Sequence, residues 1–176
     1  MYNDKLQRRQ QRMMQVNNSL FNAFHEDHAA LGRALYDLRN ALAADDFRAA
    51  KKIAEKLERE AGAHIAFEEI DFYPALQPFL SDAEINDMYA EHAKGLALIE
   101  DIRNAEPAPV SAAMRQNFIN RTEALEAHVS ECGELFGAMG GLSTKEQEAL
   151  KQRLDHWRKK APSWSEAAVL ARKTPR

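Results

Sequence analysis

The sequence predicts an all-α protein: an antiparallel up-down-up-down four-helix bundle with an additional C-terminal helix. Apolar residues recur at steps of three and four along most of the 176-residue chain, which is the period of one face of a helix. No sustained alternation of apolar and polar residues, the pattern of a half-buried strand, interrupts them. The connections between the first four helices are short, and short connections favour antiparallel neighbours. The chain is long enough for one domain to bury its own core.

The first two helices are predicted from stripes of apolar residues along one face. The first stripe consists of Phe21, Phe24, His28, Leu31, Leu35, Leu38 and Leu42. A polar break at residues 44–46 separates it from the second stripe, which consists of Ile53, Leu57, Ala61, His64, Glu68 and Phe72. Pro74 is expected to kink or end the second helix, because a proline cannot donate a backbone hydrogen bond. Both stripes contain side chains that can bind metal ions.

Capping boxes, in which a serine and a glutamate three residues later satisfy the first N–H groups of a helix, predict two further helix starts. Ser81 with Glu84 begins the third helix, and Ser143 with Glu146 begins the fifth. The third stripe consists of Ile85, Met88, His92, Leu96, Ile99 and Ile102, and the fourth of Phe118, Leu125, His128, Cys132, Leu135 and Met139. The fifth helix is expected to end near Lys160. The residues after Pro162 lack a clear period and are expected to pack loosely.

The charge and the hydropathy of the chain exclude several classes of protein. The formal net charge is -3, whereas proteins that coat nucleic acids take much of their binding energy from a basic surface. No apolar run approaches the ~20 residues of a membrane span, and the N-terminus lacks the apolar core of a signal peptide. The single cysteine, Cys132, cannot form an internal disulfide, in keeping with a reducing compartment. We therefore predict a cytoplasmic protein that binds neither nucleic acid nor membrane.

A repeat with a period of 64 residues relates the two halves of the predicted bundle. At this offset the segment 38–41 (LRNA) aligns with 102–105 (IRNA), His28 aligns with His92, and His64 aligns with His128. His64 lies 36 residues after His28, and His128 lies 36 residues after His92. The two halves therefore resemble a duplicated helical hairpin in which each helix carries one histidine.

Helix geometry puts these histidines near a common level. His28 and His64 lie at similar distances from the turn near residue 45, so at ~1.5 Å rise per residue their heights differ by roughly 3 Å. His92 and Glu68 lie at matching distances from the turn near residue 80. His128 lies further along its helix, a difference that the proline-containing loop before it can absorb.

Two other histidines are set aside. His25 is an alternative on the first helix, but the repeat aligns it with Tyr89 and not with a histidine. His156 lies outside the repeat, in the fifth helix, and is interpreted as a surface residue. We therefore choose His28 as the ligand on the first helix.

Four histidines and a carboxylate in one apolar core predict a metal site. Without an ion, the imidazoles and the carboxylate would lose hydration and leave many polar atoms to satisfy. Both groups are ligands of divalent and trivalent metals, and the ion offsets the buried charge. His64 and Glu68 are four residues apart, and so lie on the same face of a helix. The predicted ligands are His28, His64, Glu68, His92 and His128.

These residues resemble those of the hemerythrin-like HHE cation-binding domains. The resemblance covers about residues 20 to 140 and is most specific in residues 26–28 (EDH), 64–74 (HIAFEEIDFYP) and 91–92 (EH) and around His128. It implies a hemerythrin-like bundle with a non-haem di-iron centre. By its motifs, the resemblance implies that His28, His64, Glu68, His92 and His128 are metal ligands and that Glu68 bridges the ions. On this basis residues 1–19 form an N-terminal segment, 20–140 the metal-binding bundle, and 141–176 a C-terminal helix and tail.

The chain departs from that family at Cys132, where the pattern has a second carboxylate and where the repeat aligns it with Glu68. A thiolate is softer than a carboxylate, and it favours zinc or shifts the potential of iron. Three interpretations stay open: Cys132 is a metal ligand, Glu131 takes its place, or Cys132 is an unreactive core residue. Zinc or a single metal ion is therefore an alternative to a di-iron centre.

The resemblance implies a metal-binding protein that binds or senses dioxygen, nitric oxide or iron, with a protein partner that the sequence does not identify. Relatives that repair iron centres usually carry an additional N-terminal module with cysteine chemistry, and residues 1–19 contain no cysteine. One alternative is a di-iron oxidase or a peroxide-reducing enzyme, because open metal positions beside a thiol can reduce peroxide. Another is a helical interaction module whose polar cluster, with zinc or a single metal ion, is structural.

Overall fold

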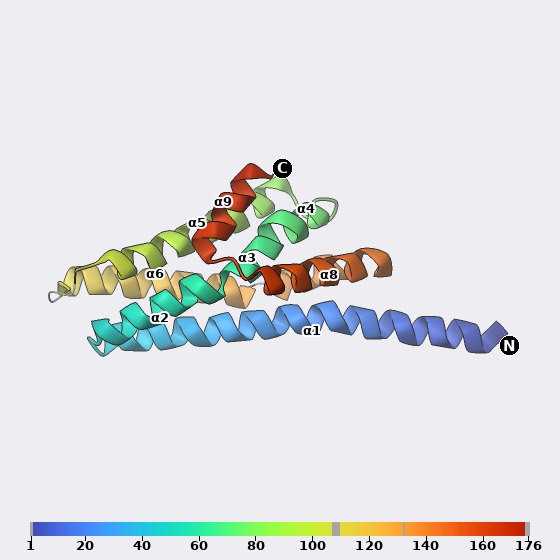
Figure 1. The fold of residues 1–176 in the computed structure, drawn as a ribbon, viewed down its shortest axis with the longest axis horizontal. Coiled ribbons are helices and arrows are strands. Elements are labelled where there is room, and N and C mark those ends of the chain that lie inside the picture. Colours follow the sequence, from blue (N-terminus) through green and yellow to red (C-terminus); the bar gives the residue numbers. More distant parts are fainter. Residues whose placement is uncertain (1, 107–109, 132, 175–176) are drawn as a thin grey trace.

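The computed structural model describes residues 2–106, 110–131 and 133–174, and within these ranges every regular element is a helix (Figure 1). Helix α1 (Tyr2–Ala43) precedes α2 (Phe47–Glu60), α3 (Gly62–Phe67), a π-helical turn η1 (Glu68–Phe72) and α4 (Tyr73–Leu76). These are followed by α5 (Asp82–Asn104), α6 (Ala112–Glu131), α7 (Gly133–Gly140), α8 (Thr144–Lys160) and α9 (Trp164–Lys173). The predicted all-helical class is confirmed for the described residues. None of the described helices combines the length and the apolar character needed to cross a membrane.

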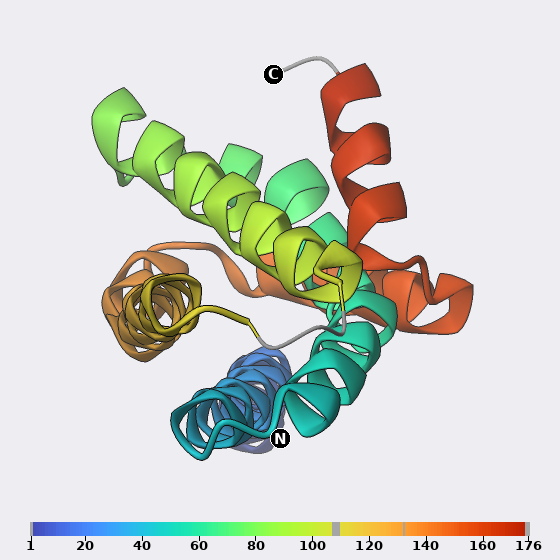
Figure 2. The same cartoon turned by 90° about the vertical axis from the view of Figure 1, so that its left-hand side faces the viewer.

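Four helices surround the core of the molecule. Helix α1 packs against α2 and α6, and α5 packs against the same two helices, so the contacts close a ring. Figure 2 looks along α1 and α6 and shows this ring from one end. The fully buried core side chains include Phe24, Leu38, Phe67, Leu98 and Ile102. Their transfer from water, at roughly 25 cal/mol per Å², is the main stabilising contribution. The pairs α1–α2 and α5–α6 correspond to the hairpins of the predicted repeat, and the strict up-down-up-down order stays a prediction.

Helix α1 begins at Tyr2, well before the apolar stripe that starts at Phe21. The segment ahead of the stripe is rich in Gln, Arg and Met, which have high helix propensity, so the helix continues without a core-facing pattern. In Figure 1 the N-terminal end of α1 extends beyond the other helices. Helix α1 therefore has a core-packing part and an N-terminal extension.

The second predicted helix is divided into consecutive segments. At Ala61 the chain passes from α2 into α3, and in η1 the backbone N–H of Tyr73 donates to the carbonyl oxygen of Glu68, five residues earlier. Pro74 follows directly, and its ring crowds the preceding turn, so the expected kink takes the form of a π turn. Residues five apart share one face of such a turn, which places Tyr73 on the same side as Glu68.

Both predicted capping boxes are present, at Ser81 with Glu84 and at Ser143 with Glu146. The expectation of a loosely packed tail is wrong, because the residues after Pro162 form α9, which begins with a third capping box at Ser163. Ala161 ends α8 in the left-handed conformation, with φ of 44°, and turns the chain towards α9. The buried face of α9 consists of Trp164, Ala167 and Ala171, and its small residues gave only a weak apolar stripe.

Two glycines allow α9 and the turn before it to pack closely against the bundle. A Cβ atom at Gly62 would overlap the backbone of Pro162 and Ser163. A Cβ atom at Gly95 would lie 2.8 Å from the ring of Trp164, well inside van der Waals contact. The C-terminal helix is therefore fitted to the bundle and covers α3 and α5.

Candidate metal centre

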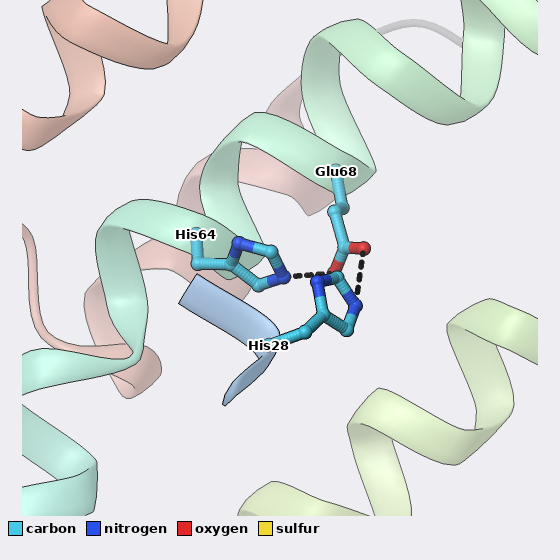
Figure 3. A group of neighbouring side chains, drawn as sticks. All are labelled: His28, His64 and Glu68. Carbon is cyan, nitrogen blue, oxygen red and sulfur yellow. Dashed lines mark ion pairs between the residues drawn. The ribbon is translucent and has the colours of Figure 1, made fainter. Parts of the chain in front are cut away.

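Glu68 is a buried carboxylate at the centre of the predicted ligand set. It begins the π turn η1, and its side chain is 2% exposed. Its Oε2 atom lies 3.3 Å from Nε2 of His64 and 3.2 Å from Nε2 of His92, and its Oε1 atom lies 3.7 Å from Nε2 of His28. Figure 3 shows the rings of His28 and His64 turned towards the carboxylate. The structure thus brings together predicted ligands from α1, α3, η1 and α5.

His28, His64 and Glu68 form a group that can hold a metal ion. Each offers one ligand atom, and these atoms all lie within 4.8 Å of one another. Nε2 of His64 and Oε1 of Glu68 are buried and make no hydrogen bond to the described residues. Buried polar atoms normally have a partner, and an imidazole nitrogen beside a carboxylate oxygen suits a cation. The residues therefore fit a bound metal.

His128 extends this cluster from α6. Its ring centroid lies 5.4 Å from that of His92, and its side chain is half-buried. The rings of His28 and His64 lie 4.5 Å apart, so the histidines form two pairs. Glu68 contacts both members of the first pair and His92 of the second.

The Nδ1 atoms of three histidines face acceptors on the side away from Glu68. Nδ1 of His28 lies 2.9 Å from the carbonyl oxygen of Phe24. Nδ1 of His64 lies 3.3 Å from Oδ2 of Asp27, and Nδ1 of His92 lies 3.0 Å from Oε1 of Glu69. When Nδ1 donates its proton to these acceptors, Nε2 carries the lone pair that binds an ion. Such contacts fix the tautomer and the orientation of metal-binding histidines.

The buried charges depend on one another. Burial by itself would raise the pKa of Glu68, but the charges of His64 and His92 lower it well below its usual value. Burial also opposes the charged forms of His64 and His92, yet Glu68, helped by Asp27 or Glu69, raises the pKa of both to about 9. Burial and the charge of His64 lower the pKa of His28 to about 4. When protonated, His64 and His92 thus balance the charges of Glu68 and of the neighbouring carboxylates Asp27 and Glu69, and a cation would displace these protons.

A small apolar cavity lies beside the predicted ligands. Its volume is about 20 Å³, which is room for about one water-sized molecule. The four predicted histidines and Glu68 line one part of it. The apolar part of the wall consists of Leu31, Leu35, Leu57, Ala61, Ile65, Leu125, Val129 and Trp164. The cavity therefore suits a very small ligand with little polar surface.

Sequence reasoning gave no role to three residues that contact the predicted ligands. Asp27 and Glu69 accept from histidines, and each is the sequence neighbour of a predicted ligand, which is a weak signal. The hydroxyl of Tyr73, a fully buried residue, lies 3.2 Å from Nε2 of His92. Tyr73 reaches this position because of the π turn, and a period of 3.6 residues does not predict it.

Cys132 and Glu131 are the two alternative ligands that the sequence offers on the fourth helix. Cys132 lies outside the described residues, so its ligand role stays a prediction. Glu131 is exposed and lines a groove of about 550 Å³, while His128 lines both this groove and the small cavity. The two histidines that the repeat leaves out, His25 on α1 and His156 on α8, are both exposed.

Comparison with known protein families agrees with this geometry. The family model of the hemerythrin HHE cation binding domain matches residues 19–139. This region contains all five predicted histidine and glutamate ligands, and it ends before α8 and α9. No curated protein and no solved structure matched the chain. Since the family model matches well over half of the sequence, the chain belongs to the hemerythrin HHE cation binding domain family.

Proposed function

We propose that the protein holds a non-haem iron centre of two ions inside an antiparallel four-helix bundle, and that it binds or senses dioxygen, nitric oxide or iron. The observation that carries this proposal is a buried cluster of imidazoles and a carboxylate beside a small apolar cavity. The ligands predicted to hold the ions are His28, His64, Glu68, His92 and His128.

The chemistry of the ligands supports iron, because imidazole and carboxylate together suit non-haem iron and leave positions open for an added ligand. Two ions are supported by the pairing of the histidines and by the position of Glu68 between the pairs. Its carboxylate contacts His28 and His64 of one pair and His92 of the other, so it is within reach of both. When bound, iron would supply an open coordination position and a redox couple.

The shape and polarity of the cavity support a diatomic ligand. With about 20 Å³ of space, the cavity has room for about one water-sized molecule, so only the smallest ligands fit. Its apolar wall does not offer hydrogen bonds to a larger polar substrate. Binding or sensing of a small gas is therefore favoured over catalysis on an organic substrate.

The test is elemental analysis and an absorption spectrum of protein purified without added metal. The same sample is then exposed to dioxygen and to nitric oxide under reducing conditions. We expect iron, at about two ions per chain, and a spectrum that changes reversibly with gas. Zinc with no response to gas would contradict the proposal in favour of a structural site. Sustained consumption of added peroxide would contradict it in favour of an enzyme.

A further inference from the structure

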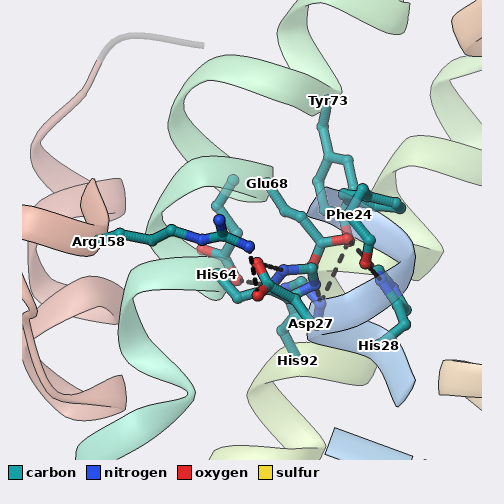
Figure 4. A network of polar contacts seen from close by, with 9 residues as sticks. Phe24, Asp27, His28, His64, Glu68, Tyr73, His92 and Arg158 are labelled. Atoms are coloured by element: carbon teal, nitrogen blue, oxygen red, sulfur yellow. Dashed lines mark hydrogen bonds and ion pairs between the residues drawn. The ribbon is translucent and has the colours of Figure 1, made fainter. Parts of the chain in front are cut away.

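Helix α8 lies outside the region that the family model matches, yet it reaches one of the predicted ligands. It packs against α1 and α3, the helices that carry His28 and His64. Near its end, Nη2 of Arg158 donates to Oδ1 of Asp27 at 2.7 Å and to the carbonyl oxygen of Ala23 at 3.1 Å. The other oxygen of Asp27, Oδ2, lies 3.3 Å from Nδ1 of His64. Figure 4 shows this chain of contacts from Arg158 through Asp27 to His64 and Glu68.

Asp27 needs a second contact in order to keep its orientation. Its side chain is 24% exposed, so a carboxylate held by His64 alone could turn towards water. Arg158 fixes it from the other side, and its guanidinium also contacts the backbone of α1, which limits rotation of both groups. The equivalent acceptors of the other histidines are less free to turn: the Phe24 carbonyl is a backbone group of α1, and the Glu69 side chain is only 10% exposed.

We propose that Arg158 is a positioning residue of the metal centre, which holds Asp27 so that Asp27 orients His64 towards the ion. The inference rests on the proposed role of His64 as a ligand. Acceptors of this kind, placed behind a ligating histidine, typically change metal affinity 10–100-fold. Since Arg158 acts one step further away, we expect its effect at the lower end of that range. Helix α8 would then contribute to metal binding although it lies outside the matched region.

The simpler alternative is that Arg158 only attaches α8 to the bundle, and the chain offers a matched control for that role. Arg153, on the same helix, donates to Oδ1 of Asp71 at 2.7 Å. Asp71 also accepts from Nε1 of Trp157 at 2.6 Å. Both contacts join α8 to η1, and neither partner of Asp71 is a predicted ligand. A purely structural contact at Arg158 predicts that Arg158→Met and Arg153→Met behave alike.

The experiment is a cobalt(II) titration of the metal-free full chain, followed by the visible spectrum of the bound ion. We expect Arg158→Met to weaken binding about tenfold and to shift the spectrum. Arg158→Lys should recover part of the affinity, since it keeps the charge but replaces the planar guanidinium by a more flexible ammonium group. Arg153→Met should bind as the wild type does. Thermal melts of the metal-free variants should differ little, because such partly exposed ion pairs contribute little stability.

A double variant tests whether Arg158 acts through Asp27. Asp27→Ala should lower the affinity more than Arg158→Met, and adding Arg158→Met to Asp27→Ala should cause no further loss. Wild-type affinity and spectrum in Arg158→Met, or losses that multiply in the double variant, would overturn the inference. A wild-type protein that binds no cobalt(II) would instead contradict the proposed metal centre itself.

Discussion

Replacement of His64 or His92 by alanine is expected to remove most of the bound metal and the stability that the metal provides. Both side chains are almost fully buried, with 4% and 3% exposed. Their Nε2 atoms lie within 3.3 Å of Glu68, so each truncation removes an imidazole from the centre of the cluster.

The size of the effect follows from linkage between binding and folding. An ion that binds only the folded chain adds RT ln(1 + [L]/Kd), about 4 kcal/mol at a thousandfold excess over Kd. For a chain of this length, 1 kcal/mol shifts the melting temperature by roughly 2–4 °C. The wild-type protein is therefore expected to melt about 8–16 °C higher with metal than after chelation. In His64→Ala and His92→Ala this difference should largely disappear.

The measurements are elemental analysis and thermal melts with and without a chelator. His156→Ala is the control, since His156 is exposed on α8 and should keep both the metal and the shift. If all three variants retained the same metal content and the same metal-dependent shift, the assignment of His64 and His92 as ligands would be refuted.

Three further predictions concern acidity, the cavity wall and the cysteine. The metal-free protein should lose stability as the pH rises from 6.5 to about 9, because the pKa of His64 and His92 is raised to about 9 on folding; the stabilisation is complete below 6.5 and vanishes as both deprotonate. Thermal melts between pH 6 and 10 check this, and a melting temperature that stays constant up to pH 10 would contradict it. Trp164→Ala should lower the free energy of unfolding by about 3–5 kcal/mol, whereas Val169→Ala, an exposed position on α9, should change it little in urea titrations. As a predicted ligand, the Cys132 thiol should alkylate more slowly with metal than without; equal rates would remove it from the ligand set.

Local rules predicted the elements and the centre of the site. The capping serines Ser81 and Ser143 marked helix starts because a side-chain acceptor three residues before a backbone N–H is a local requirement. Helix geometry placed His28 beside His64 because both lie at similar distances from the short turn near residue 45, which brings such positions to one level. The contacts of both histidines with Glu68 follow from that register.

Contacts between distant segments were beyond such rules. The bond from Arg158 to Asp27 joins residues 131 positions apart, and no period or spacing in the sequence relates them. Helix α9 was missed because two of its three buried residues are alanines, which contribute little to an apolar pattern. Tyr73 was missed because the π turn changes the helical period at the residues that build the site.

The wall of the cavity includes residues other than those that are predicted to bind the ion. The predicted ligands lie within the matched region, but Trp164 closes the cavity from α9, and Gly95 has no side chain where that ring packs. Gly62 likewise has no side chain where the turn before α9, at Pro162 and Ser163, packs against the bundle. A ligand motif can therefore specify the ion without specifying the whole wall of the cavity beside it. In this chain, Trp164 supplies one part of the wall of the 20 Å³ cavity, and its position depends on the fit between the bundle and the C-terminal helix.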